Sequence, residues 1–263
     1  MLILDLTSSQ EYYNQHGWLI FPSPETSLPA PSITSQVIAS TLLPTKPLRT
    51  TDLAPLCEID VAILTKFFQS TTPSLNSTNS FRSDKHTHTL IALLPTYAQA
   101  TWHFGSEDFI ASKIFDPPQV PTVKGAAVDA NIWCYWVHDY SDDVLTLLRI
   151  VSPSMYNELH ANTHSSNKAP RAVTPEEEIK AVASLLHAAQ VEAAAWGLHK
   201  VELWDPNSAV LAACNLLLGT KAVVNIRMEK SIPCLRWKST PDGGGNEVER
   251  GVQWIALEKY GWC

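Results

Sequence analysis

The sequence has no long hydrophobic run and little charge. None of its stretches reaches the roughly 18 uninterrupted apolar residues that a membrane helix needs. The opening residues MLILDL lack a basic start and are too short for a signal peptide. Charged residues make up only 17% of the chain, and the net charge of −7 argues against nucleic acid or an anionic membrane as a partner, because both repel negative charge. We therefore expect a cytoplasmic protein that binds neither.

Cysteine pairs and clustered metal ligands are also lacking. The five cysteines are odd in number, widely spaced and mostly set among apolar residues, which is typical of reduced thiols rather than of a disulfide framework. His86 and His88 stand close together, but no cysteine pair or third ligand lies near them in the sequence. We expect a solvated loop or strand start there, and no metal site.

Apolar residues, in contrast, occur in the proportion of a folded globular protein. Hydrophobic residues make up 45% of the 263 positions, so the chain can bury a full core as one large domain or two small ones. The nine tryptophans are many for this length and indicate either an aromatic-rich core or a pocket for a flat, apolar ligand. The core interpretation is favoured.

The chain divides into a proline-rich first part and a more regular remainder. Gly17 is suited to end a helix, a strand can begin at 18–21, and prolines recur among serines and threonines at 22–47, which is typical of a linker or crossover. Apolar residues three and four apart predict a helix at 51–67. Later helices are expected at 96–115, 174–197 and 207–219. Strands are expected at 89–94, 122–128, 131–138, 144–151, 201–204, 222–228, 232–238 and 252–258.

The order of these elements indicates an α/β fold of the α+β kind. The polar turn at 139–143 joins two apolar runs and predicts an antiparallel hairpin of 131–138 with 144–151. A second strand pair, 222–228 with 232–238, is expected near the end of the chain. We therefore predict a mainly antiparallel twisted sheet flanked by helices.

Several short segments, together with the element order, resemble one family. These segments are 102–109 (WHFGSEDF), 124–126 (KGA), 133–136 (WCYW), 147–150 (LLRI) and 254–262 (WIALEKYGW). They resemble fungal lysine N-acetyltransferases of the lysine-catabolism type, within the GNAT acyltransferase superfamily. The resemblance implies a GNAT-like fold and acyl transfer from acetyl-CoA to an amine.

The resemblance also implies a division of the chain. Members of this family carry a catalytic GNAT domain followed by a second GNAT-like domain, and residues 12–18 (YYNQHGW) are similar to the end of the late helix of the first. Residues 1–50 are therefore expected to be a remnant of a first GNAT domain with a proline-rich linker. Residues 51–263 are expected to form the second, complete GNAT-like domain.

Two positions match functional residues of this family. Tyr13, four residues before Gly17, is expected to be the acid that protonates the thiolate leaving group, although it can equally pack the end of a helix. Asn207 matches an asparagine that contacts the cofactor, and it also fits an ordinary helix N-cap. Four residues before Gly219 stands Asn215, whose amide cannot protonate a thiolate, so the second domain resembles a degenerate copy.

His103, Glu107 and Asp108 form a polar group on one expected helix. The two carboxylates lie one turn after the imidazole, an arrangement that can bind a cationic amine substrate. Charges of this kind on a helix surface are commonly only solvated. Both interpretations remain open at the level of the sequence.

A phosphate-binding loop for coenzyme A is missing from the sequence. No glycine lies between Val128 and Trp196, and the segment 174–178 reads TPEEE, whose glutamates repel a phosphate approaching a helix N-terminus. These features argue against binding of acetyl-CoA. Two functions remain open: an N-acyltransferase acting on a small-molecule amine and an acyl-CoA, or a non-catalytic or repurposed GNAT-like domain that binds a small molecule or partner without coenzyme A.

Overall fold

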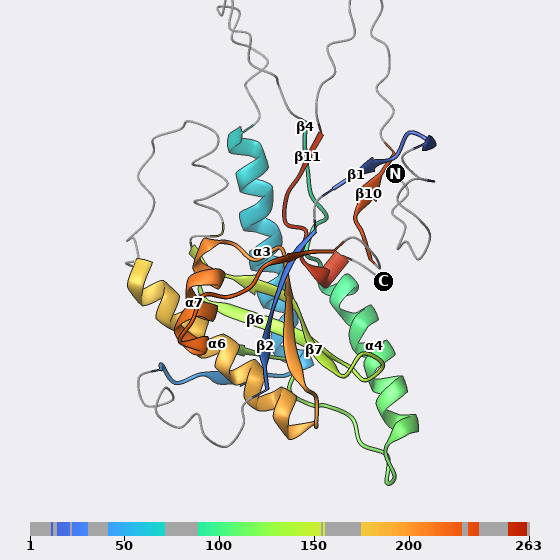
Figure 1. Ribbon diagram of the computed structural model, residues 1–263, viewed down its shortest axis with the longest axis vertical. Coiled ribbons are helices and arrows are strands. Elements are labelled where there is room, and N and C mark those ends of the chain that lie inside the picture. The colour runs from blue at the N-terminus through green and yellow to red at the C-terminus, as the bar shows by residue number, and fades with distance from the viewer. Residues whose placement is uncertain are drawn as a thin grey trace, which may run out of the picture.

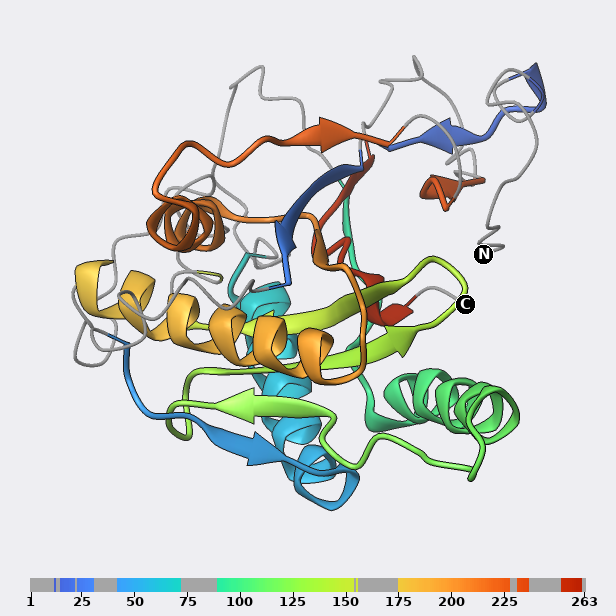
Figure 2. The same cartoon turned by 60° about the horizontal axis from the view of Figure 1, so that its bottom comes forward.

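The fold is a central sheet with helices on both faces. The computed structural model describes residues 12, 15–21, 23–30, 42–71, 89–153, 155, 175–227, 231–236 and 252–261. A seven-stranded, mostly antiparallel sheet runs through the middle, with α6 (Pro175–Ala195) and α7 (Ser208–Leu218) on one face. Helices α3 (Thr50–Thr71) and α4 (Tyr97–Ile114) cover the other face (Figure 1, Figure 2). The predicted α/β fold class is therefore confirmed.

The strands form one large sheet and two small ones. The order in the large sheet is β3 (Lys46–Leu48), β5 (Gly125–Ala127), β6 (Trp133–Asp139), β7 (Val144–Val151), β8 (Lys200–Trp204), β2 (Pro24–Pro29) and β9 (Asn225–Ile226). The small sheets pair β1 (Leu19–Ile20) with β10 (Cys234–Leu235), and β4 (Thr89–Ile91) with β11 (Val252–Trp254), which precedes the short 3-10 helix η1 (Lys259–Gly261). No helix in the described part of the chain is both long and apolar enough to cross a bilayer.

Local signals in the sequence fix the ends of the helices. Asn207 caps α7, because its side-chain oxygen accepts a hydrogen bond from the Val210 amide at 2.9 Å. Gly219 ends the same helix in the left-handed conformation with φ of 66°, which favours glycine. Pro175 occupies the first position of α6, where the missing N–H costs nothing. Helices α3, α4, α6 and α7 overlap the ranges expected from the sequence.

The hairpin of β6 and β7 is confirmed, and it carries a bulge. The register between the two strands skips Leu148, which is left as an extra residue on β7. β7 and β8 form the one parallel pair of the large sheet as described, and their pairing ends where Leu147 meets Leu203. β7 continues to Val151, whereas β8 ends at Trp204. The two strands therefore separate at their carboxyl ends.

Two segments of the region expected to be a linker, 22–47, are strands of the large sheet. β2 lies between β8 and β9, antiparallel to both, and β3 forms the opposite edge beside β5. In β2, Thr26 and Leu28 are buried and the residue between them is exposed, as in a half-buried strand. Prolines at both ends of β2 hide this alternation in the sequence. The division of the chain at residue 50 stays a prediction.

The expected pairing of 222–228 with 232–238 is wrong. Among the described residues, β9 pairs with β2 and β10 pairs with β1. Both partners come from residues 19–29. β9 and β10 are close in the sequence, but each pairs with a strand from the other end of the chain. β11 likewise pairs in parallel with β4, more than half the chain away.

The described cysteines and tryptophans lie mainly in the interior. Cys57, Cys134, Cys214 and Cys234 are free and buried, and in the described residues no three His, Cys, Asp or Glu side chains are grouped as metal ligands. Cys263, His86 and His88 lie outside the described residues. The buried tryptophans are Trp18, Trp133, Trp136, Trp204 and Trp254, whereas Trp102 on α4 is exposed. This distribution agrees with the favoured interpretation of an aromatic core.

Candidate functional site

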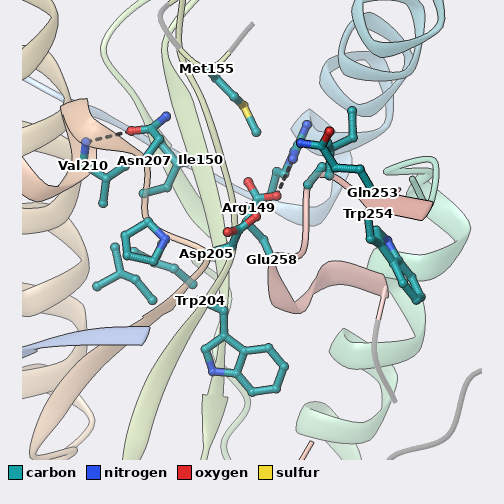
Figure 3. Close-up of a pocket in the computed structure, with 15 residues that line it drawn as sticks. Arg149, Ile150, Met155, Trp204, Asp205, Asn207, Val210, Gln253, Trp254 and Glu258 are labelled. Carbon is teal, nitrogen blue, oxygen red and sulfur yellow. Dashed lines mark hydrogen bonds and ion pairs between the residues drawn. The ribbon is translucent and has the colours of Figure 1, made fainter. Parts of the chain in front are cut away.

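A pocket opens where β7 and β8 separate. Its volume is about 320 Å³, and it lies outside the carboxyl ends of two parallel strands, the place where open α/β sheets bind ligands. The walls come from the end of β7, from the connection between β8 and α7, and from the segment after β11 (Figure 3). The Leu148 bulge sits at its edge, and such bulges commonly adjoin functional sites. We call this cavity the split-strand pocket.

Arg149 is the cation at the base of the split-strand pocket. Its side chain is completely buried, and its guanidinium donates two hydrogen bonds to the Asp60 carboxylate from α3, at 2.8 and 2.9 Å. A third bond reaches Glu258 at 2.6 Å. The guanidinium carbon also lies 5.1 Å from the centre of the Tyr260 ring. These contacts hold Arg149 in one position, because a bidentate carboxylate fixes the planar guanidinium.

Two carboxyl groups, Glu258 and Asp205, line the pocket on the same side as Arg149, and Glu258 is in direct contact with it (Figure 3). Burial raises the pKa of Glu258 to about 7; Asp205 and Asp60 also raise it, whereas Arg149 lowers it. Burial likewise raises the pKa of Asp205, whose Oδ2 accepts a hydrogen bond from the Leu257 amide at 2.9 Å. A carboxyl group with a pKa near 7 exchanges protons readily at neutral pH.

The charges around the split-strand pocket favour a cationic ligand. When all three are ionised, Asp60, Asp205 and Glu258 outnumber the two guanidinium groups that act on them, those of Arg149 and Arg227. Apolar side chains, including Leu147 and Leu203, complete the walls. The arrangement suits a positively charged group on an apolar stem, and a buried site strengthens such electrostatic attraction.

Asn207 lies in the wall of the split-strand pocket. Its side-chain oxygen is used to cap α7, which confirms the N-cap alternative. Contact with a cofactor stays a prediction for this residue. Tyr13, the expected catalytic acid, lies outside the described residues.

His103, Glu107 and Asp108 lie on α4 and do not line the split-strand pocket. Glu107 is buried, forms an ion pair with the Lys124 ammonium and accepts a hydrogen bond from the His138 amide at 2.8 Å. Asp108 contacts the same ammonium at 2.7 Å. The two carboxylates therefore already hold an amine, that of Lys124. Substrate binding by this group stays a prediction.

The pKa values of the two histidines beside Glu107, His103 and His138, are shifted in opposite directions. Burial lowers the pKa of His103 to about 4, and its Nε2 lies 3.3 Å from the Tyr260 carbonyl oxygen. Burial works against a charged His138 as well, but the hydrogen bond to Glu107 and the Glu192 carboxylate 3.4 Å from its Nε2 overcome this and raise its pKa. The cluster thereby ties α4 to the end of β6.

Sequence reasoning missed the four charged residues that define the split-strand pocket. Asp60, Arg149, Asp205 and Glu258 are too far apart in the chain for any motif to connect them; Arg149 and Glu258 are separated by 109 positions. One signal was available. Arg149 is a single charge inside an apolar run, and buried charges of this kind are nearly always paired.

The described residues do not fit the pyrophosphate of coenzyme A. Helix α6 begins with Glu176, Glu177 and Glu178, which repel an anion at that end. Arg149 is the only lysine or arginine among the described residues that line the split-strand pocket, and its guanidinium is already engaged by two carboxylates.

Comparison with known proteins supports the resemblance at the level of the superfamily. The family model of the LYC1 GNAT-like C-terminal domain matches residues 27–263, a match that begins inside β2 and includes every later element. No curated protein and no solved structure matches the chain. Because the family model covers nearly the whole sequence, this chain belongs to the LYC1 GNAT-like C-terminal domain family.

Proposed function

We propose that this GNAT-like domain serves acyl transfer to an amine, and that the split-strand pocket binds and deprotonates that amine. The observation that carries the proposal is Glu258, a carboxyl group with a pKa of about 7 in the wall of the pocket. An amine attacks an acyl group only in its neutral form, so a base titrating near neutral pH is the group this chemistry needs.

The pocket supplies both parts of such a site. An ammonium group is attracted by Asp205 and Glu258, and the apolar walls accommodate the stem that carries it. The lysine side chain, implied by the resemblance, has this form: a compact ammonium on a flexible four-carbon stem. Arg149 orients the Glu258 carboxylate, and Asp60 orients Arg149 in turn. Glu258 then takes the proton from the ammonium.

Acetyl-CoA would supply the acyl group when bound. Because the described residues do not fit its pyrophosphate, the role proposed for this chain is limited to the amine and its proton. Binding of the acyl group and protonation of the leaving thiolate are not part of this role.

The proposal is tested by measuring acetyl transfer from acetyl-CoA to lysine by the full chain. Glu258→Gln keeps the shape of the side chain but removes the base, and the rate should fall by roughly 10²–10⁴-fold. The exposed Glu58 on α3 provides the control, since Glu58→Gln should leave the rate unchanged. An unchanged rate in Glu258→Gln, given activity of the wild type, would show that Glu258 is not the base.

A second candidate function is amine binding without coenzyme A, and the three glutamates that begin α6 favour it. Titration calorimetry with lysine and with acetyl-CoA separates the two functions. Heat from lysine alone supports the binding domain, whereas micromolar binding of acetyl-CoA contradicts it and supports transfer.

A further inference from the structure

A second pocket lies away from the split-strand pocket, under α6 and near the β3 edge of the large sheet. Its volume is about 360 Å³, and it shares no lining residue with the split-strand pocket. Its walls come from β5 and β6, from the segment 42–47 and from one side of α6. We call it the α6 pocket.

The walls of the α6 pocket are mostly apolar. They include Leu42, Val123, Ala126, Ala188 and Val191. Val191 is 51% exposed, so the pocket reaches the surface beside α6. Small residues at positions 126 and 188 keep the sheet and the helix from filling the space between them.

One wall residue, Trp136, carries a buried hydrogen-bond donor without an acceptor. Its side chain is 1% exposed, and its indole Nε1–H makes no hydrogen bond in the part of the chain that the structure describes. A buried N–H left unpaired is costly, and groups of this kind normally find an acceptor. A ligand in the α6 pocket with a carbonyl or hydroxyl oxygen would supply one.

The other polar groups in the wall limit the charge of such a ligand. Ser184 is already used, because its hydroxyl accepts from the Leu43 amide and donates to the Lys180 carbonyl. Glu192 accepts a hydrogen bond from the Trp196 indole at 3.0 Å, and its carboxylate opposes an anion in the pocket. The half-buried His187 imidazole also lines the pocket.

We propose that the α6 pocket binds a small, uncharged, mostly apolar molecule that carries one hydrogen-bond acceptor, which the Trp136 indole recognises. An apolar cavity of about 150 Å³ suffices for benzene, so the larger α6 pocket has room for a molecule of two fused rings. This ligand is distinct from the amine of the proposed function, and the inference does not depend on it.

Two probes of equal shape test the proposal: 1-indanone, which has a carbonyl, and indane, which lacks it. Binding is followed in the full chain by the indole N–H signals in a two-dimensional ¹H–¹⁵N NMR spectrum, in which Trp136→Phe identifies the signal of Trp136. We expect 1-indanone to shift that signal to lower field and to bind roughly fivefold more tightly than indane, the value of one hydrogen bond.

Two variants on α6 make the location of the site falsifiable. Ala188→Phe fills the pocket from its half-buried wall and should abolish the shift. Ala194→Phe places the same side chain at an exposed position outside both pockets and should leave binding unchanged. The proposal is overturned if 1-indanone at millimolar concentration leaves the Trp136 signal unmoved, if Ala188→Phe binds as the wild type does, or if indane binds equally well.

Discussion

The two faces of the large sheet are built in different ways. The face under α6 and α7 is packed mainly with apolar side chains, several of them alanines of α6, although α6 also buries Ser184 and Gln190. The face under α3 and α4 also has an apolar cluster, but it buries ion pairs beside it, between Arg149 and Asp60 and between Lys124 and Glu107. We call the face under α6 and α7 the apolar face and the face under α3 and α4 the charged face. Buried apolar area stabilises the apolar face, whereas the stability of the charged face requires that both partners of each ion pair are present.

This difference explains where the chemistry lies. The split-strand pocket opens beside the Arg149 ion pairs, so the groups that hold α3 against the sheet also act on the pKa of Glu258, which burial raises. Among its described wall residues, the α6 pocket on the apolar face has one buried donor without an acceptor, the Trp136 indole N–H. Four measurements test the contrast, in order of expected effect.

The largest effect is expected for Arg149→Leu. It leaves Asp60 and Glu258 buried without their cation, and loss of one partner from a buried ion pair costs about 3–5 kcal/mol of unfolding free energy. Urea denaturation measures this loss. Arg49→Leu, at an exposed position, is the control and should change the unfolding free energy by less than about 0.5 kcal/mol. Equal effects of the two substitutions would show that the Arg149 pairs do not stabilise the charged face.

Leu186→Ala tests the apolar face. Leu186 is completely buried on α6, and its truncation should cost about 2–5 kcal/mol through lost burial and a cavity. This cost should be the same at pH 5 and pH 8. The cost of Arg149→Leu should instead be smaller at pH 5, where the stranded carboxyl groups take up protons. Leu216→Ala on the exposed side of α7 is the matched control.

The third effect concerns the pH dependence of stability. The pKa of Glu258 is raised from 4.5 to about 7 in the folded chain, so the folded state binds this proton more tightly than the unfolded state does. The resulting stability is complete below pH 4.5 and is lost as the pH rises through about 7, a change on the order of 3 kcal/mol. Unfolding free energies measured across this range should fall less steeply in Glu258→Gln than in the wild type or in Glu58→Gln. Parallel profiles would count against the raised pKa.

The smallest effect is expected for Asn207→Ala. It removes the oxygen that accepts from the Val210 amide and should cost about 1 kcal/mol of unfolding free energy. Asn207→Asp keeps an acceptor at the helix N-terminus and should restore most of the loss. Failure of the aspartate to restore stability would point to a role of Asn207 other than capping.

Much of the fold could be predicted because its signals are local. The bounds of β7, the hairpin turn before it and the caps of α7 depend on residues within a few positions of one another. β2 escaped prediction because its partners, β8 and β9, lie near the other end of the chain. A strand is recognised in a sheet by its neighbours, and the sequence does not show which segments become neighbours.

The residues of the candidate site could not be predicted from the sequence for the same reason. Asp60, Arg149, Asp205 and Glu258 come from four separate segments, and only the packing of α3 and the segment after β11 against β7 brings them together. Glu107 shows the converse. Its position on a helix suggested a surface charge, but α4 turns it inward onto Lys124 and His138.

The place of β2 in the large sheet has a consequence for synthesis on the ribosome. Glu25 of β2 pairs with Trp204 of β8, and Pro24 pairs with Ile226 of β9, so β2 leaves the ribosome long before either partner strand exists. Until then its edges are open to other chains, and contacts between such distant segments form slowly. We therefore expect the sheet to close last at β2. The prolines at both ends of this strand lack an N–H and should limit mispairing before its partners are made.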